Sequence, residues 1–94
     1  MPATRPRILI AEDHTLVREG MRQLLAEDFE VVAAVEDGRA LLAVAERLQP
    51  ELILIDISMP RLNGLDAARQ LACVCPGSRL VVVTSHADPA YVQA

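Results

Sequence analysis

Apolar residues along the chain follow two different patterns. Four short runs are continuous and rich in leucine or β-branched residues, which is typical of strands buried on both faces of a sheet. These runs are residues 8–11, 31–35, 52–55 and 80–83. Between them lie stretches in which apolar residues recur with helical spacing. The alternation predicts βαβ units and therefore an α/β fold built on a doubly wound parallel sheet.

The first expected helix follows the first strand, with Thr15 as its predicted N-cap. One face of this helix is apolar, and the charged residues 18, 19 and 22 lie outside it. The residues of the apolar face are Val17, Met21, Leu24 and Leu25.

Local signals bound the other helices. The second is set off by Asp37-Gly38 and stops near Gln49, because Pro50 disfavours helical geometry in the residue before it. The third runs from about residue 65 and ends at residues 75–77, which read Cys-Pro-Gly. A last helix is predicted to begin at Asp88, and the sequence contains about one turn of it.

The length of 94 residues, 52% of them hydrophobic, leaves room for one domain with one aliphatic core. We therefore expect residues 1–94 to form a single domain without an output domain. No apolar run approaches the ~20 residues that a membrane-spanning helix needs, and no signal-peptide core follows the amino terminus. A cytoplasmic protein without membrane contact is expected.

Charge and residue types narrow the possible chemistry. The net charge is −4, and all nine basic residues are dispersed arginines, which disfavours direct nucleic-acid binding. The absence of lysine excludes a Walker-type phosphate loop and Schiff-base catalysis. Cys73 and Cys75 form neither a disulfide framework nor a zinc pattern, so reduced thiols are expected. Any chemistry must therefore rely on carboxylates.

Polar side chains follow three of the four predicted strands. Glu12-Asp13 comes after the first strand, Asp56 after the third and Thr84-Ser85 after the fourth. Ligands of open parallel sheets bind at the carboxyl ends of the strands, so these residues are expected at one edge. Three carboxylates there would repel one another, and a divalent cation with oxygen ligands would relieve the repulsion.

Each of these residues also has a simpler interpretation. The acidic pair could decorate the start of a helix, Asp56 could form a turn, and Thr84 could be an ordinary strand residue. His14 and His86 could be surface histidines. The position of Asp56 directly after a buried strand argues for a function, because an unpaired carboxylate is costly there.

The order of these residues resembles the receiver domain of bacterial response regulators. Two segments, residues 13–21 (DHTLVREGM) and 56–64 (DISMPRLNG), are similar to receivers joined to LuxR-type helix-turn-helix output domains. The resemblance extends from Arg7 to Ala94. It implies a flavodoxin-like fold with strand order 2-1-3-4-5, of which the fifth strand and fifth helix are not in this sequence. Residues 79–84 would then form an unpaired, apolar edge strand.

The resemblance implies a phosphorylation-controlled switch in a two-component system, which promotes only its own phosphorylation and dephosphorylation and is not an enzyme. Asp56 would accept the phosphoryl group, and the Thr84 hydroxyl would bind a phosphoryl oxygen. The cation, Mg²⁺ or Mn²⁺, would be held by Glu12, Asp13, Asp56 and the backbone carbonyl of Ser58. Modulating positions would be Met59, Pro60, Ser85 and His86, with Ser58 also tuning the access of water. Expected partners are a sensor histidine kinase, the output domain of the full-length protein, and a second copy in a homodimer or swapped arrangement.

The family also uses a lysine and an aromatic residue of the fifth strand, and neither is in this sequence. Phosphorylation of these 94 residues is therefore expected to be slow or absent. One alternative is a pseudo-receiver that acts through dimer contacts without phosphorylation. A haloacid-dehalogenase-like phosphotransferase is a weaker alternative, because Ser58 stands where that family needs a second aspartate.

Overall fold

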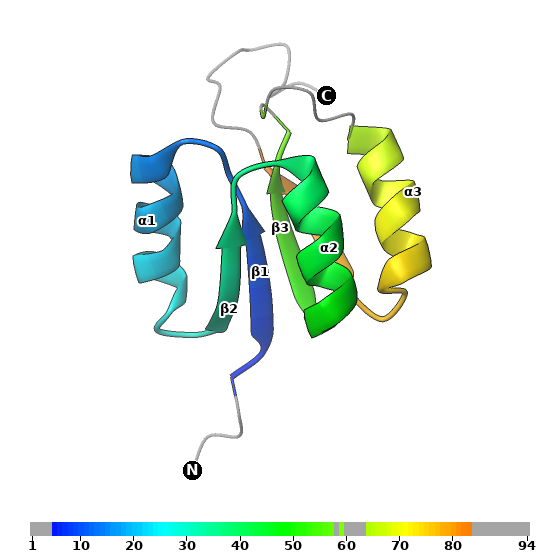
Figure 1. Ribbon diagram of the computed structural model, residues 1–94. Coiled ribbons are helices and arrows are strands. Elements are labelled where there is room, and N and C mark those ends of the chain that lie inside the picture. Colours follow the sequence, from blue (N-terminus) through cyan, green and yellow to red (C-terminus); the bar gives the residue numbers. More distant parts are fainter. Residues whose placement is uncertain (1–4, 58, 60–63, 84–94) are drawn as a thin grey trace.

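The chain forms one parallel sheet with helices on both faces. The computed structural model describes residues 5–57, 59 and 64–83. In chain order the elements are β1 (Arg7–Ala11), α1 (Thr15–Leu25), β2 (Glu30–Val35), α2 (Gly38–Leu48), β3 (Leu52–Asp56), α3 (Gly64–Val74) and β4 (Arg79–Val83). All three strand pairs are parallel, and the strand order is β2-β1-β3-β4. Helix α1 covers one face, while α2 and α3 cover the other (Figure 1). The predicted doubly wound fold is confirmed.

Burial differs between the central and the outer strands. Leu9 and Ile10 of β1 and Ile53 and Ile55 of β3 are almost completely buried. Strand β2 is only half-buried, and Val82 of the edge strand β4 is 50% exposed. Burial on both faces, predicted for all four strands, is therefore wrong for β2 and β4, whereas the exposed edge at β4 is confirmed for the described residues.

Helix α1 packs less completely than its sequence pattern predicts. Met21 and Leu25 are half-buried against the sheet, but Leu24 is 75% exposed, and no residue of the helix is fully buried. The reason is that the main contacts of α1 within the described part of the chain are with β1 and β2 alone. Val17 is 39% exposed as well, so of the predicted apolar face only Met21 and Leu25 are partly buried.

The N-cap of α1 is His14 and not Thr15, which is the first helical residue. The backbone of His14 is extended, and its carbonyl oxygen accepts a hydrogen bond from the N–H of Arg18 at 2.8 Å. Its imidazole makes no capping bond to the helix, because it contacts Glu12 instead. The cap position is thus given to a residue whose side chain faces the acidic edge.

The boundaries predicted for the other helices are confirmed. Asp37 caps α2, with Oδ1 accepting a hydrogen bond from Ala40 N at 2.8 Å. Gln49 ends the helix in the left-handed conformation at φ 47°. Helix α3 ends just before Cys75. The predicted helix that begins at Asp88 lies outside the described residues.

Two further expectations concern cysteines and membranes. Cys73 is exposed and Cys75 is buried, and neither forms a disulfide, in agreement with the predicted reduced thiols. Within residues 5–57, 59 and 64–83, no helix has the length and apolar character needed to cross a bilayer.

Candidate functional site

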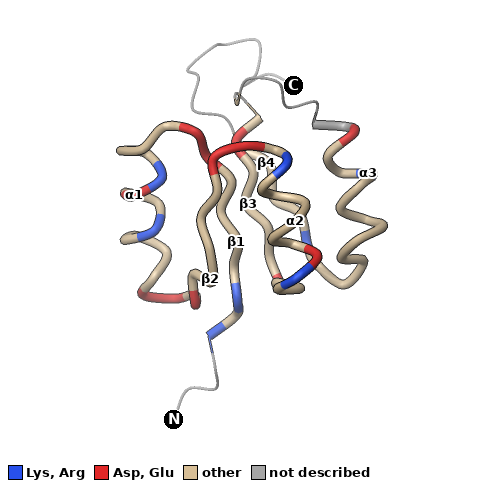
Figure 2. The backbone as a smooth tube through the Cα atoms, in the orientation of Figure 1, with Lys and Arg blue, Asp and Glu red and all other residues tan. Residues whose placement is uncertain are grey.

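Three carboxylates meet at the carboxyl ends of the two central strands. The register pairs Ala11 of β1 with Ile55 of β3, so the residues that follow, Glu12 and Asp56, are neighbours at the same edge. One ligand atom from each of Glu12, Asp13, His14 and Asp56 lies within 4.8 Å of the others. Figure 2 shows the acidic segments along this edge of the sheet. The sequence predicted the convergence of the carboxylates but did not include His14.

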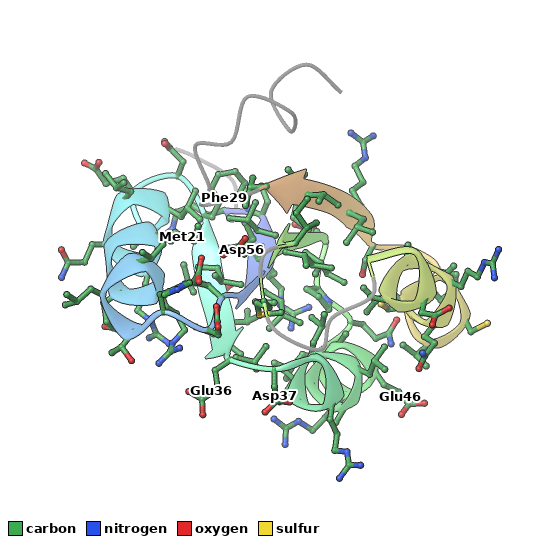
Figure 3. All side chains as sticks on the ribbon, turned by 90° about the horizontal axis from the view of Figure 1, so that it is seen from above. Met21, Phe29, Glu36, Asp37, Glu46 and Asp56 are labelled. Carbon is green, nitrogen blue, oxygen red and sulfur yellow. The ribbon has the colours of Figure 1, made fainter. Side chains whose placement is uncertain are left out.

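Two of the three carboxylates are withdrawn from solvent. Glu12 is 0% and Asp56 is 1% exposed, and Figure 3 shows Asp56 near the centre of the molecule between the helical layers. Burial raises the pKa of Glu12, and the nearby Asp56 carboxyl group raises it further, while the contacts with His14 oppose the rise. A cation bound at this edge would therefore stabilise the ionised form of these buried carboxyl groups.

His14 binds the acidic pair from one side. Its backbone N–H donates to Glu12 Oε2 at 2.9 Å, and its Nδ1 lies 2.8 Å from the same oxygen. Nδ1 is also 3.1 Å from Asp13 Oδ1. The contact with Glu12 and the charge of Asp13 raise the pKa of the imidazole, although its side chain is 56% exposed.

Arg18 connects the loop after β1 with the loop after β2. Its Nη1 donates to the backbone carbonyl of Glu12 at 2.9 Å and lies 3.7 Å from Glu36 Oε2. The sequence pattern placed Arg18 outside the packed face of α1, but its side chain is only 15% exposed. Long side chains in a first helical turn point back toward the helix start, which is the signal that could have predicted this contact.

Several predicted site residues fall outside the described part of the chain. These are Ser58, Pro60, Thr84, Ser85 and His86. Met59 is described, and its side chain is buried in the hydrophobic core cluster. Its backbone N–H donates to the carbonyl oxygen of Asp56 at 3.3 Å, so it follows the phosphoacceptor candidate in a tight turn.

The residues present fit a hard divalent cation. Carboxylate oxygens are the donors that Mg²⁺ and Mn²⁺ prefer. Glu12 Oε1 is buried and has no hydrogen-bond partner among the described residues, so this acceptor at the edge is unsatisfied. A cation would satisfy this oxygen and offset the repulsion between the carboxylates.

Comparison with known proteins identifies the family. Residues 8–94 match the response regulator receiver domain model, and the chain therefore belongs to the response regulator receiver domain family. It is 42% identical over 88 residues to the transcriptional regulatory protein DegU of Brevibacillus brevis, covering 92% of this chain and 37% of that protein. It is 39% identical over 80 residues to the response regulator GacA of Pseudomonas aeruginosa, covering 83% of this chain and 37% of that protein.

Solved structures agree with this assignment. The receiver domain of the putative response regulator NarL from Mycobacterium tuberculosis superposes with a TM-score of 0.82 at 28% identity, covering 97% of this chain and 75% of that chain. A DNA-binding response regulator of the LuxR family from Staphylococcus aureus gives a TM-score of 0.78, also at 28% identity, and covers 94% of this chain and 75% of that chain. The predicted family and its LuxR-type relatives are confirmed. The chain spans well under half the length of the curated relatives.

Proposed function

We propose that this chain is the phosphoacceptor module of a two-component switch and that Asp56 receives the phosphoryl group. The observation that supports the proposal is the burial of Asp56 at the end of β3, with Glu12 and Asp13 as acidic neighbours. Family membership gives the general role of a receiver. The individual residue roles are our proposal.

The proposed reaction is a transfer to a carboxylate. An oxygen of Asp56 attacks phosphorus in a phosphohistidine or a small acyl phosphate, and the new P–O bond forms as the bond to the leaving imidazole or carboxylate breaks. The product is an acyl phosphate on Asp56. The added charge would then shift the conformation of the domain.

Glu12, Asp13 and Asp56, with the backbone carbonyl of Ser58, would hold the cation. Bound Mg²⁺ or Mn²⁺ supplies positive charge that stabilises the phosphoryl oxygens during transfer. The Thr84 hydroxyl would donate a hydrogen bond to one of those oxygens. Met59, Pro60, Ser85 and His86 are proposed to modulate the lifetime of the phosphoryl group.

Mass spectrometry after incubation with an acyl phosphate and Mg²⁺ tests the proposal. One phosphoryl group is expected on Asp56 of the full-length protein, and on these 94 residues it is expected to form slowly or not at all, because no lysine of this sequence neutralises the phosphoryl oxygens. The Asp56→Asn variant should remain unmodified. Asp37→Asn is the matched control, because it changes an aspartate at the same edge to another good helix cap and should be modified like the wild type. An adduct on Asp56→Asn contradicts the proposal, as does an unmodified full-length protein.

The proposed partners follow from the family and from the exposed outer strand β4. A sensor histidine kinase would donate the phosphoryl group, and a helix-turn-helix output domain in the full-length protein would respond to it. We also propose that a second copy pairs with β4, where Val81 and Val82 are 44% and 50% exposed. Light scattering at micromolar concentration should detect a dimer, and a monodisperse monomer would contradict this association.

A further inference from the structure

The two oxygens of the Glu12 carboxyl group have opposite environments. Oε2 accepts the backbone N–H of His14 at 2.9 Å and lies 2.8 Å from the His14 Nδ1. Oε1 is buried and has no hydrogen-bond partner among the described residues. One oxygen is therefore contacted twice by the same residue, and the other is buried without a hydrogen-bond partner among the described residues.

No basic side chain in the described network reaches Oε1. The guanidinium of Arg18 binds the backbone carbonyl of Glu12 and pairs with Glu36. A fully buried carboxylate oxygen without a partner is costly, and a protein retains one where a ligand satisfies it. One ligand atom from each of Glu12, Asp13, His14 and Asp56 lies within 4.8 Å of the others, so the Glu12 carboxyl group borders the space that a cation would occupy.

We propose that His14 is a positioning residue for the cation site, because its side chain fixes the Glu12 carboxyl group with Oε1 directed to the divalent ion. This inference rests on the proposed function of the acidic edge as a cation-dependent phosphoacceptor site. The ionised Glu12 oxygen can only accept, so the contact requires a proton on Nδ1 of His14. The imidazole then acts as a donor to the ligand and does not itself bind the ion.

The side chain of His14 adds something that its backbone cannot. With one hydrogen bond from the backbone N–H alone, the Glu12 carboxyl group can still rotate about χ3, because this terminal torsion has no sharp energy minimum. A second donor on the same oxygen fixes the plane of the carboxyl group. Partners of this kind behind a metal ligand typically change metal affinity by about 10–100-fold. His14 is partly exposed, so we expect the lower end of that range.

Two variants separate the donor role from other effects of substitution. His14→Asn keeps an N–H donor close to the position of Nδ1, whereas His14→Leu removes the donor but keeps a side chain of similar size. Leu16→Ala is the matched control, because Leu16 is in the first turn of α1, close to His14 in the chain, and its side chain is 87% exposed. Circular dichroism and thermal unfolding establish that each variant is folded.

The measurement is cation binding itself, by calorimetry with Mg²⁺ and by the electron paramagnetic resonance signal of free Mn²⁺. We expect His14→Leu to bind both ions about tenfold more weakly, with His14→Asn and Leu16→Ala within about twofold of the wild type. Equal affinity of His14→Leu and wild type overturns the inference. If His14→Asn binds the cations as weakly as His14→Leu does, His14 does not act as a hydrogen-bond donor to Glu12.

A softer ion distinguishes positioning from direct ligation. If the imidazole were a ligand, Co²⁺ would show visible absorption bands that change in both His14 variants, and the positioning role would be overturned. Failure of the proposed function gives a different result. In that case the wild type itself binds no cation, or Asp56 is not phosphorylated although the His14 variants differ in cation affinity.

Discussion

The two edges of the sheet are built on opposite principles. At the carboxyl ends of the strands, Glu12 and Asp56 are buried beside each other, and one oxygen of Glu12 has no hydrogen-bond partner among the described residues. At the amino ends, the polar groups are paired. Gln49 Nε2 donates to the carbonyls of Glu46 and Val74, both at 2.8 Å. The comparison indicates that one edge stabilises the fold and the other is held at an energetic cost.

The amino-terminal edge also connects elements that are distant in sequence. Arg7 donates through Nη1 to the Gln49 carbonyl and through its backbone N–H to Glu51 Oε2, both at 3.0 Å. Ser78 Oγ donates to the carbonyl of Pro50. Strand β1, the end of α2 and the turn before β4 are thereby tied together. At the acidic edge, by contrast, the described part of the chain has a buried Glu12 oxygen without a hydrogen-bond partner.

Of substitutions at the two edges, the largest effect on stability is expected at the amino-terminal edge. Gln49→Ala removes the side-chain hydrogen bonds to two helix ends and should lower the free energy of unfolding by about 2 kcal/mol. Urea unfolding measures this loss. Gln49→Gly loses the same bonds but relieves the left-handed backbone, and should recover about 1 kcal/mol of it. Wild-type stability of Gln49→Ala would show that the edges do not differ in this way.

At the acidic edge, a substitution is expected to raise the free energy of unfolding rather than lower it. Glu12→Gln removes a buried charge, keeps an oxygen for the His14 donors, and gives Asp56 an amide donor. Without divalent ions, this variant should be more stable than the wild type by roughly 1 kcal/mol. Urea unfolding in a chelating buffer is the measurement. A destabilised variant would mean that the carboxylates are already compensated within the folded chain.

The stability of the metal-free chain should depend on pH through the acidic edge. The pKa of Glu12 is raised above its ordinary value of 4.5, so the folded chain binds this proton more tightly than the unfolded chain. Metal-free stability should therefore rise as pH falls through the raised pKa toward 4.5. The raised pKa of His14 acts in the same direction, since its contribution is present below 6.5 and is lost as pH rises through the raised value.

Stabilisation by added Mg²⁺ should depend on pH in the opposite sense. The cation competes with the proton for Glu12, so its stabilising effect is larger at about pH 8 than at about pH 5, and is about 1.4 kcal/mol at ten times the dissociation constant. Thermal unfolding with and without Mg²⁺ at both pH values checks the sign. In Glu12→Gln the pH dependence of the metal effect should be weaker. An equal metal effect at the two pH values would contradict the role of Glu12.

The smallest effect is expected on α1, away from both edges. Leu24→Gln replaces an apolar side chain that is 75% exposed and should change the free energy of unfolding by less than about 0.5 kcal/mol. Leu41→Ala provides the contrast, because Leu41 is fully buried and should cost about 3 kcal/mol. A loss for Leu24→Gln that approaches the Leu41 value would show that the exposed face of α1 is covered in solution.

The sequence by itself determined the elements, their order and the edge of the sheet that carries the site. The apolar runs predicted parallel strands, and parallel strands bring their carboxyl ends to one edge, so Glu12, Asp13 and Asp56 were expected to converge. Tertiary packing decided the rest. Leu24 repeats with helical spacing but is exposed, because periodicity gives the face of a helix and not what covers it. The contacts of His14 and Arg18 with Glu12 depend on the path of one loop, which side-chain spacing alone does not specify.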